Sequence, residues 1–441
     1  MVHTRRHVFK GMLTAVQLTN FKCFKRIDLD LASVTVFIGP NGTGKSSVAQ
    51  ALMVLKQSLD THRPPMLKVD GPLSLGKFED ILLFDARDKE ITISISGRAM
   101  VEGAGVSFLY SARFDQIGLK WHKCQTVCED ADVLFKISQP ELKLAATYDV
   151  DRNEWTINPP EIKLDGIKFT FRCSNRVGKA VEIESVSTGP PDRARVNEYR
   201  ALLQDLLTSI SRTIENIYFV PGIRGIDTTL SDFHNEEVRE FISGGGISSD
   251  TKKLVSAFGY YPDITRHVGE ILEKITQVKV RYKSVPGPKQ TLETLRANYV
   301  GNIINDGLGT NQLLFPIAQV IRAPSQSLII IEEPELHLHP RAQTDLVDAL
   351  VGIARNEQKQ LLLITHSEHI LFRLLNQVAK GLLRPQEVMV YYFERENMLA
   401  QARKLEIDEK GRLKGGMAGF FEHDIEQVGE YIRAILNEKE T

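Results

Sequence analysis

Residues Gly39 to Ser46 read GPNGTGKS, which is the residue spacing of a loop that wraps a phosphate group. Its glycines let the backbone approach a phosphate closely, and its N–H groups face the anion together with the positive end of the following helix. Lys45 would place its charge on the β- and γ-phosphates, and Ser46 would offer a hydroxyl to Mg²⁺. The predicted nucleotide-binding residues are Gly39, Pro40, Asn41, Gly42, Thr43, Gly44, Lys45, Ser46 and Ser47.

The segments on either side of this loop match the context that it requires. Residues 34–38 (VTVFI) form a short, mostly apolar run that is typical of a buried central strand. Residues 46–59 carry apolar side chains at helical spacing. A strand, a phosphate loop and an amphipathic helix therefore follow one another, and a chance glycine-rich turn is the weaker interpretation.

A second group of polar residues follows apolar strands later in the chain. Residues 328–333 read LIIIEE, so a strand would deliver Glu332 and Glu333 at its carboxyl end, where ligands bind in α/β sheets. We expect Glu332 to help hold Mg²⁺ and Glu333 to activate the attacking water. His366 follows the next apolar run, 361–364, and would contact the γ-phosphate or the attacking water. Solvated acids and a structural histidine are the alternatives.

The pattern of elements along the chain predicts an α/β protein with additions. Residues 78–186 alternate in the manner of an antiparallel meander, and 234–282 turn mostly helical. Strand and helix alternate from residue 328 onward, which favours a mostly parallel sheet. The expected divisions are an N-terminal part with the phosphate loop (1–60), a β-rich subdomain (61–190), a helical insertion (191–295) and a C-terminal part (296–441).

Composition excludes several classes of protein. The 441 residues include 55 basic and 56 acidic side chains, 42% apolar residues and 4 cysteines. These values exclude a disordered chain, a disulfide framework and a surface that is basic throughout. No apolar run approaches the ~20 residues that cross a bilayer, and the N-terminus lacks the apolar stretch of a secretory signal. We therefore expect a cytoplasmic protein with no membrane contact.

Four weaker patterns have structural or solvated interpretations that we favour. A metal pair is possible in His337-Leu338-His339, and a zinc site in WHKCQTVC (121–128), but neither has a full ligand set. Arg224 in the loop 221–225 is either a phosphate or interface contact or, more simply, a solvated arginine. The basic residues of the helical middle could touch DNA phosphates or merely be solvated. These are Arg193, Arg195, Arg200, Lys274, Lys279, Arg281 and Lys283.

The whole order of motifs resembles a known group of proteins. GPNGTGKS, a β-rich insertion, helices, INDGLGTNQLL, LIIIEEPELHLHP and LLLITHS follow one another as in the ABC-type P-loop ATPase heads of the SMC, RecF and OLD group. Segments 18–24 and 419–424 resemble the start and the short C-terminal tail of those heads. The chain looks like the prokaryotic "AAA family ATPase" proteins that lack a long coiled coil and a nuclease domain.

This resemblance implies a homodimer that holds two ATP molecules between its subunits. Each site would combine the phosphate loop and acids of one subunit with the signature segment of the other. Residues 305–312 lie where that segment should be, and Gly307, Gly309, Thr310 and Asn311 would contact the partner's nucleotide. The family often has Ser where Asn311 stands, and the usual glutamine after the first helix is not evident. Asp80 or Lys77, within 73–81, are candidates to replace it.

The biological task is predicted by analogy alone. The resemblance suggests the ATPase and sensor component of a prokaryotic anti-phage defence system, which controls a separate effector protein. A RecF-like repair ATPase that binds DNA, and an ATP-gated scaffold with little turnover, are the alternatives. The balance of charge suggests that any DNA contact is a local patch on the helical middle.

Overall fold

The structure is a computed structural model. It describes residues 12–59, 73–101, 104–116, 119–128, 142–149, 154–158, 163–164, 167–173, 181–186, 208–222, 224–225, 231–232, 251–284, 289–296 and 298–414. Arg193, Arg195, Arg200 and the tail-like segment 419–424 lie outside these residues. No helix within the described residues is long and apolar enough to cross a membrane.

A seven-stranded sheet forms the centre of the molecule and carries the phosphate loop. Its strands lie in the order β12 (Ile217–Val220), β17 (Leu328–Glu332), β18 (Gln360–Ile364), β3 (Val34–Ile38), β19 (Val388–Glu396), β20 (Leu399–Ile407) and β21 (Leu413–Lys414). The first five strands run parallel, and the last two are antiparallel. Every residue of β3 is buried, so the predicted central strand is confirmed.

Helices pack on both faces of this sheet, because its strands are apolar on both sides. On β17, Leu328 and Ile330 belong to one apolar cluster, and Ile329 and Ile331 belong to the other. The first cluster includes helix α1 (Lys45–Leu59), and the second includes α8 (Leu308–Arg322), α9 (Pro340–Asn356) and α10 (Glu368–Ala379). The near-continuous apolar strands of the sequence therefore have the buried, doubly covered place that their composition predicts.

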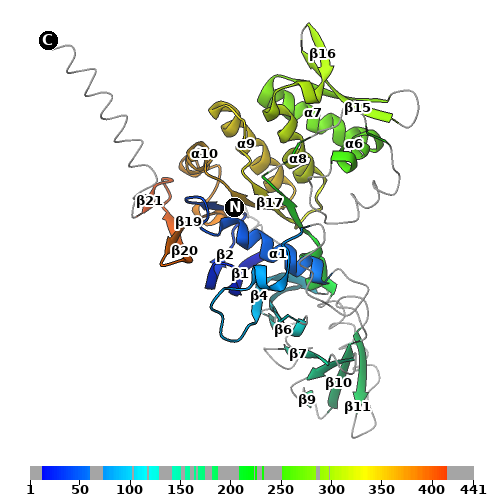
Figure 1. The fold of residues 1–441 in the computed structure, drawn as a ribbon, viewed down its shortest axis with the longest axis vertical. Helices are drawn as coiled ribbons and strands as arrows, with labels where there is room; N and C mark the ends of the chain where they lie inside the picture. The colour runs from blue at the N-terminus through cyan, green and yellow to red at the C-terminus, as the bar shows by residue number, and fades with distance from the viewer. Residues whose placement is uncertain are drawn as a thin grey trace, which may run out of the picture.

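The predicted meander is a second, fully antiparallel sheet. Its order is β2 (Phe24–Asp30), β1 (Leu13–Phe21), β4 (Ile91–Val101), β5 (Ala104–Phe114), β6 (Leu119–Cys128), β7 (Leu142–Asp149) and β8 (Glu154–Asn158). The short helix α2 (Phe78–Ile81) precedes β4. A small sheet of β9 (Lys163–Leu164), β10 (Ile167–Cys173) and β11 (Val181–Val186) lies beyond it, at the lower end of Figure 1. The α/β class and the antiparallel subdomain are therefore confirmed.

The region expected to be helical is helical only in part. Helices α6 (Thr251–Tyr260) and α7 (Pro262–Thr276) are followed by a small antiparallel sheet at the upper end of Figure 1. That sheet contains β13 (Ser231–Asp232), β14 (Lys279–Ser284), β15 (Lys289–Arg296) and β16 (Tyr299–Asn302). The 3-10 turns are η1 (Ile303–Asn305) and η2 (Pro385–Glu387). The sequence did not predict β14 to β16.

Candidate functional site

The phosphate loop connects β3 to α1. At two of its glycines, the backbone conformation and the neighbouring atoms leave no room for a side chain. Gly39 has φ +137°, and a Cβ there would lie 2.2 Å from the carbonyl oxygen of Phe393. Gly44 has φ +94°, and a Cβ there would lie 2.6 Å from Sγ of Cys23. Both conformations lie in the region that favours glycine. The glycine spacing noted in the sequence is therefore required by the local path of the chain.

Lys45 lies inside this loop with only 5% of its surface exposed. Its Nζ donates to the carbonyl oxygens of Gly39, at 2.9 Å, and Pro40, at 2.7 Å. Burial lowers the pKa of Lys45 to about 8, while the charges of Glu333, Glu332 and Glu335 act in the opposite direction. The ammonium group is thus held by the loop at the place where a bound phosphate would need its charge.

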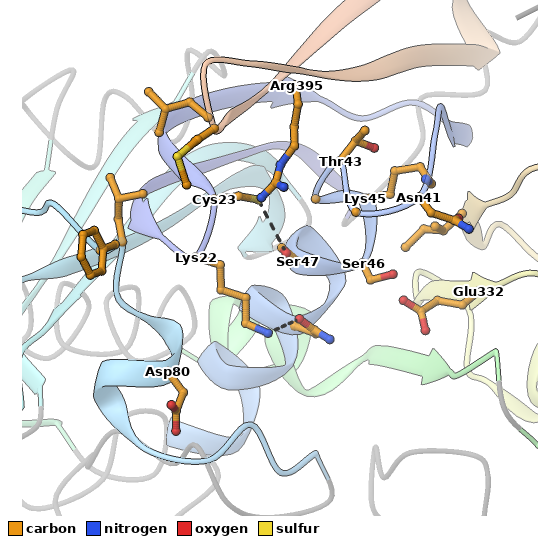
Figure 2. A pocket seen from close by; sticks show the side chains of 18 of the residues that line it. Lys22, Cys23, Asn41, Thr43, Lys45, Ser46, Ser47, Asp80, Glu332 and Arg395 are labelled. Carbon is orange, nitrogen blue, oxygen red and sulfur yellow. Dashed lines mark hydrogen bonds between the residues drawn. The ribbon is translucent and has the colours of Figure 1, made fainter.

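The two acids at the end of β17 take different positions. Burial raises the pKa of Glu332, and the nearby Ser46 hydroxyl acts in the opposite direction. Figure 2 shows the Ser46 and Glu332 side chains pointing toward one another. Glu333 has a φ of +44°, and its N–H donates to the carbonyl oxygen of Ile364 at 2.7 Å. The turn into this unusual backbone conformation separates the two carboxylates that are adjacent in sequence.

A third acid, Glu335, was not among the predicted site residues. One of its carboxylate oxygens accepts from the His366 N–H at 2.8 Å. Burial raises the pKa of Glu335. Burial also lowers the pKa of His366, with a further lowering by the charge of Lys45 and an opposite effect of Glu333, so the surroundings favour the neutral imidazole. The only sequence signal for Glu335 was the third acid in the run EEPE.

A cavity of about 1030 Å³ joins these residues. Residues 41–47 line one side, and Glu332, Glu333 and His366 line another, so most of the predicted site meets in one place (Figure 2). The cavity continues past Lys22, whose Nζ donates to Oε1 of Gln50 at 2.7 Å, toward the hairpin between β19 and β20. Its volume is that of a small-molecule or cofactor pocket.

The predicted signature segment lies at the start of α8 and does not line this cavity. Gly307 precedes the helix, and a Cβ on Gly309 would lie 2.6 Å from the carbonyl oxygen of His337. Leu308 is 58% exposed, whereas Thr310 and Asn311 are only 7% and 4% exposed. The contact of Asn311 and its neighbours with a second subunit's nucleotide therefore stays a prediction, and only Leu308 of this segment is well exposed in the single chain.

Arg224 is buried and was misjudged as a solvated loop residue. It is 7% exposed, and within the part of the chain that the structure describes its guanidinium donates to backbone carbonyl oxygens alone, among them that of Glu332 at 2.7 Å. The loop that carries Arg224 follows β12, whose four residues are all buried beside β17. The guanidinium therefore contacts the backbone at the acidic end of β17, at Glu332 and Glu333.

The other weak patterns have structural roles where the structure describes them. Asp80 lines the cavity, and its carboxylate accepts from the Lys77 N–H at 2.7 Å, which caps α2. His339 caps α9 by accepting from the Arg341 N–H at 3.3 Å. No cluster of three metal-ligating side chains occurs in the part of the chain that the structure describes. The side chains of segment 121–128, where a zinc site was the less favoured interpretation, lie outside that part.

Comparisons with known proteins agree with the motifs. A family model described as an AAA ATPase domain matches residues 12–141 and 198–371. The chain is 23% identical, over 410 residues, to the OLD nuclease of Thermus scotoductus. That match covers 88% of this chain and 66% of the relative, so the chain spans just under two thirds of the length of that nuclease.

Two solved structures have a remote likeness to the chain. One is described as the SMC head bound to the C-winged helix domain of ScpA, with 14% identity and a TM-score of 0.47, covering 90% of this chain and 98% of that one. The other is the SMC head domain from Thermotoga maritima, with 10% identity and a TM-score of 0.39, covering 90% and 100% respectively.

Proposed function

The chain belongs to the AAA ATPase domain family, and from this premise we propose that it binds and hydrolyses ATP in the cavity of Figure 2. One observation carries the proposal. The phosphate loop after β3, the acids after β17 and His366 after β18 come from three separate strands and line the same cavity. A phosphoryl-transfer site needs a phosphate cradle, a cation site and a water-activating group within one pocket.

The chain offers a cation site that fits Mg²⁺. Ser46 and Glu332 supply the hard oxygen donors that this cation prefers. Oε1 of Glu332 is buried and has no hydrogen-bond partner among the described residues, which suits an oxygen that binds a cation. When bound, Mg²⁺ would neutralise charge on the phosphates of ATP. Lys45 and the loop N–H groups would hold the same phosphates from the other side.

We assign water activation to Glu333 and its surroundings. The Glu333 carboxylate would accept the proton of the water that attacks the γ-phosphorus atom, while the bond from that atom to the leaving ADP oxygen breaks. His366 lies within electrostatic reach of both Glu333 and Lys45. Its neutral imidazole can donate a hydrogen bond to the γ-phosphate or accept one from the water. Catalysis would depend mostly on positioning and charge stabilisation.

A homodimer would complete each site. The start of α8, with Gly307 and the exposed Leu308, lies outside the cavity that holds the phosphate loop. A helix N-terminus favours negative charge, so a second subunit's α8 could face the γ-phosphate across an interface. Hydrolysis would then remove the group that holds the two subunits together, which makes ATP a switch.

For the biological task, we propose the ATPase component of a prokaryotic defence system that controls a separate effector protein. The likeness to an OLD nuclease supports a link to nucleic-acid attack. DNA binding by the chain itself has less support, since Arg281 and Lys283 on β14 both pair with Glu293. A pull-down with ATP that brings a nuclease or toxin supports the proposal, whereas DNA-stimulated turnover without such a partner favours the repair alternative.

The enzymatic proposal is tested by ATP hydrolysis in the presence of Mg²⁺. Lys45→Ala should abolish nucleotide binding and turnover, because the loop loses the charge that faces the phosphates. Lys404→Ala is the matched control. Lys404 lies on β20, does not line the cavity, and forms an exposed ion pair with Asp30 of β2. Unchanged ATP affinity in the Lys45→Ala protein would contradict the assignment of the loop.

A further inference from the structure

Among the described residues, the guanidinium of Arg224 makes five hydrogen bonds, and the acceptor of each is a backbone carbonyl oxygen. Its Nε, Nη1 and Nη2 atoms all donate, so the whole planar fork is used. The acceptors belong to Pro221 (2.8 Å), Gly222 (3.4 Å), Gln312 (3.2 Å), Glu332 (2.7 Å) and Glu333 (3.1 Å).

These acceptors lie on three elements that are distant in sequence. The carbonyls of residues 221–222 belong to the loop after β12, and those of Glu332 and Glu333 form the end of β17. The carbonyl of Gln312 lies in the first turns of α8, which begins with the exposed Leu308. Arg224 therefore joins the helix that we assign to the dimer interface with the turn that carries the catalytic acids.

Arg224 supports the acids without occupying their carboxylates. The charges of Glu335, Glu333 and Glu332 all raise its pKa, although burial lowers that pKa to about 10, so the group stays charged at neutral pH. No carboxylate among the described residues forms an ion pair with it. The guanidinium thus offsets repulsion among three acids while it leaves their oxygens available for a cation, a water molecule or His366.

The backbone at Glu333 needs such support. Its φ of +44° is a left-handed conformation that non-glycine residues rarely adopt. Three hydrogen bonds hold it among the described residues: the Glu333 N–H donates to Ile364, and the Glu333 carbonyl oxygen accepts from both the Leu336 N–H and Arg224. The position of the Glu333 carboxylate therefore depends on where the guanidinium lies, and the guanidinium is also bonded to α8.

We propose that Arg224 is a positioning residue that couples α8 to the acidic turn, so that contact of α8 with a second subunit's nucleotide sets the position of Glu333. This inference rests on the proposed ATPase dimer. A shift of α8 would move the Gln312 carbonyl, and the rigid guanidinium would transmit that shift to the carbonyls of Glu332 and Glu333. A lysine at position 224 keeps the charge but lacks the planar fork that bonds to several elements at once.

The first test is Arg224→Lys in the full chain. We expect kcat to fall by about 10- to 100-fold, as for a misplaced catalytic group, with the ATP Kd changed by less than about threefold. The matched control is Arg322→Lys. Arg322 is half-buried on the same helix α8, where it lies over the ring of Tyr218, and none of the acids at the end of β17 is among the charges that act on it. Arg322→Lys should alter the melting temperature without lowering kcat.

The second test is a double-mutant cycle with Leu308→Ala. If the signal from α8 passes through Arg224, the double variant should lose little more kcat than the more damaging single variant. Two kcat losses that multiply would overturn the coupling, and so would an Arg224→Lys protein with wild-type kcat. An inert wild-type protein that binds no ATP is a different result, because it overturns the proposed function itself.

Discussion

Glu332 and Glu333 are adjacent in sequence, but the backbone turns at Glu333, so the two residues have different neighbours. Glu332 faces Ser46, and Glu333 enters a left-handed conformation that directs the chain toward β18. This geometry supports separate roles for the two acids, one toward Mg²⁺ and one toward water. The sequence predicted both residues because an apolar strand ending in acids is a local pattern.

Glu333→Gln should lower hydrolysis by about 10²- to 10⁴-fold while ATP binding persists, because glutamine keeps the size of the side chain but accepts no proton. Single-turnover hydrolysis of radiolabelled ATP measures the chemical step directly. Normal turnover would show that another group activates the water, and Glu335 would then be the next residue to change.

Gly309→Ala adds one atom, the Cβ, to the predicted signature segment and tests whether that segment contributes to catalysis. The added Cβ would lie 2.6 Å from the carbonyl oxygen of His337, so the first turn of α8 must move. We expect kcat to fall while the affinity of a single subunit for ATP is unchanged. Gly352→Ala on α9 is the control, since a Cβ there meets nothing within 4 Å. A wild-type kcat in Gly309→Ala would remove this segment from the site.

Arg224 and Glu335 show why part of the site could not be predicted. Neither forms part of a local pattern, because Arg224 acts on carbonyl oxygens up to 109 positions away, and Glu335 acts on the N–H of a residue 31 positions away. Such partners are brought together only by the order of strands in the sheet. The phosphate loop, in contrast, could be predicted as a loop between β3 and α1 because its pattern lies within eight consecutive residues.

At the scale of elements, the sequence predicted segments whose apolar residues repeat clearly and missed those dominated by charge. β3, α1, β17 and β18 are confirmed. β14 reads KVRYKS, and its Val280 and Tyr282 pack on the helical side while Lys279, Arg281 and Lys283 are exposed. The alternation was present, but the basic side chains suggested a solvated helix instead.

Lys359 binds the last turn of α8, which allows a prediction about stability that does not involve the candidate site. Its side chain is 1% exposed, and Nζ donates to the carbonyl oxygens of Val320, at 2.6 Å, and Ile321, at 3.2 Å. Lys359→Met keeps the volume but leaves those carbonyls unpaired, so the free energy of unfolding should fall by about 1–3 kcal/mol. Denaturant titration measures that loss, and an unchanged midpoint would contradict it.

At the scale of the molecule, the family match shows an AAA ATPase domain, and the likeness to an OLD nuclease agrees with the OLD part of the predicted resemblance. The central sheet separates two apolar clusters, one on each of its faces. One face meets α1 and the antiparallel sheet, and the other meets α8, α9 and α10. The cavity lies at the carboxyl edge of that sheet, where the phosphate loop follows β3 and the acids follow β17.

The central claim is that ATP joins two copies of this chain, and that hydrolysis separates them. The most direct measurement is the molar mass of the Glu333→Gln protein by light scattering, with Mg²⁺-ATP, with Mg²⁺-ADP and without nucleotide. We predict twice the chain mass of 49.6 kDa with ATP and a single chain in the other two conditions. The same mass in all three conditions, with ATP bound, would contradict the nucleotide-driven dimer.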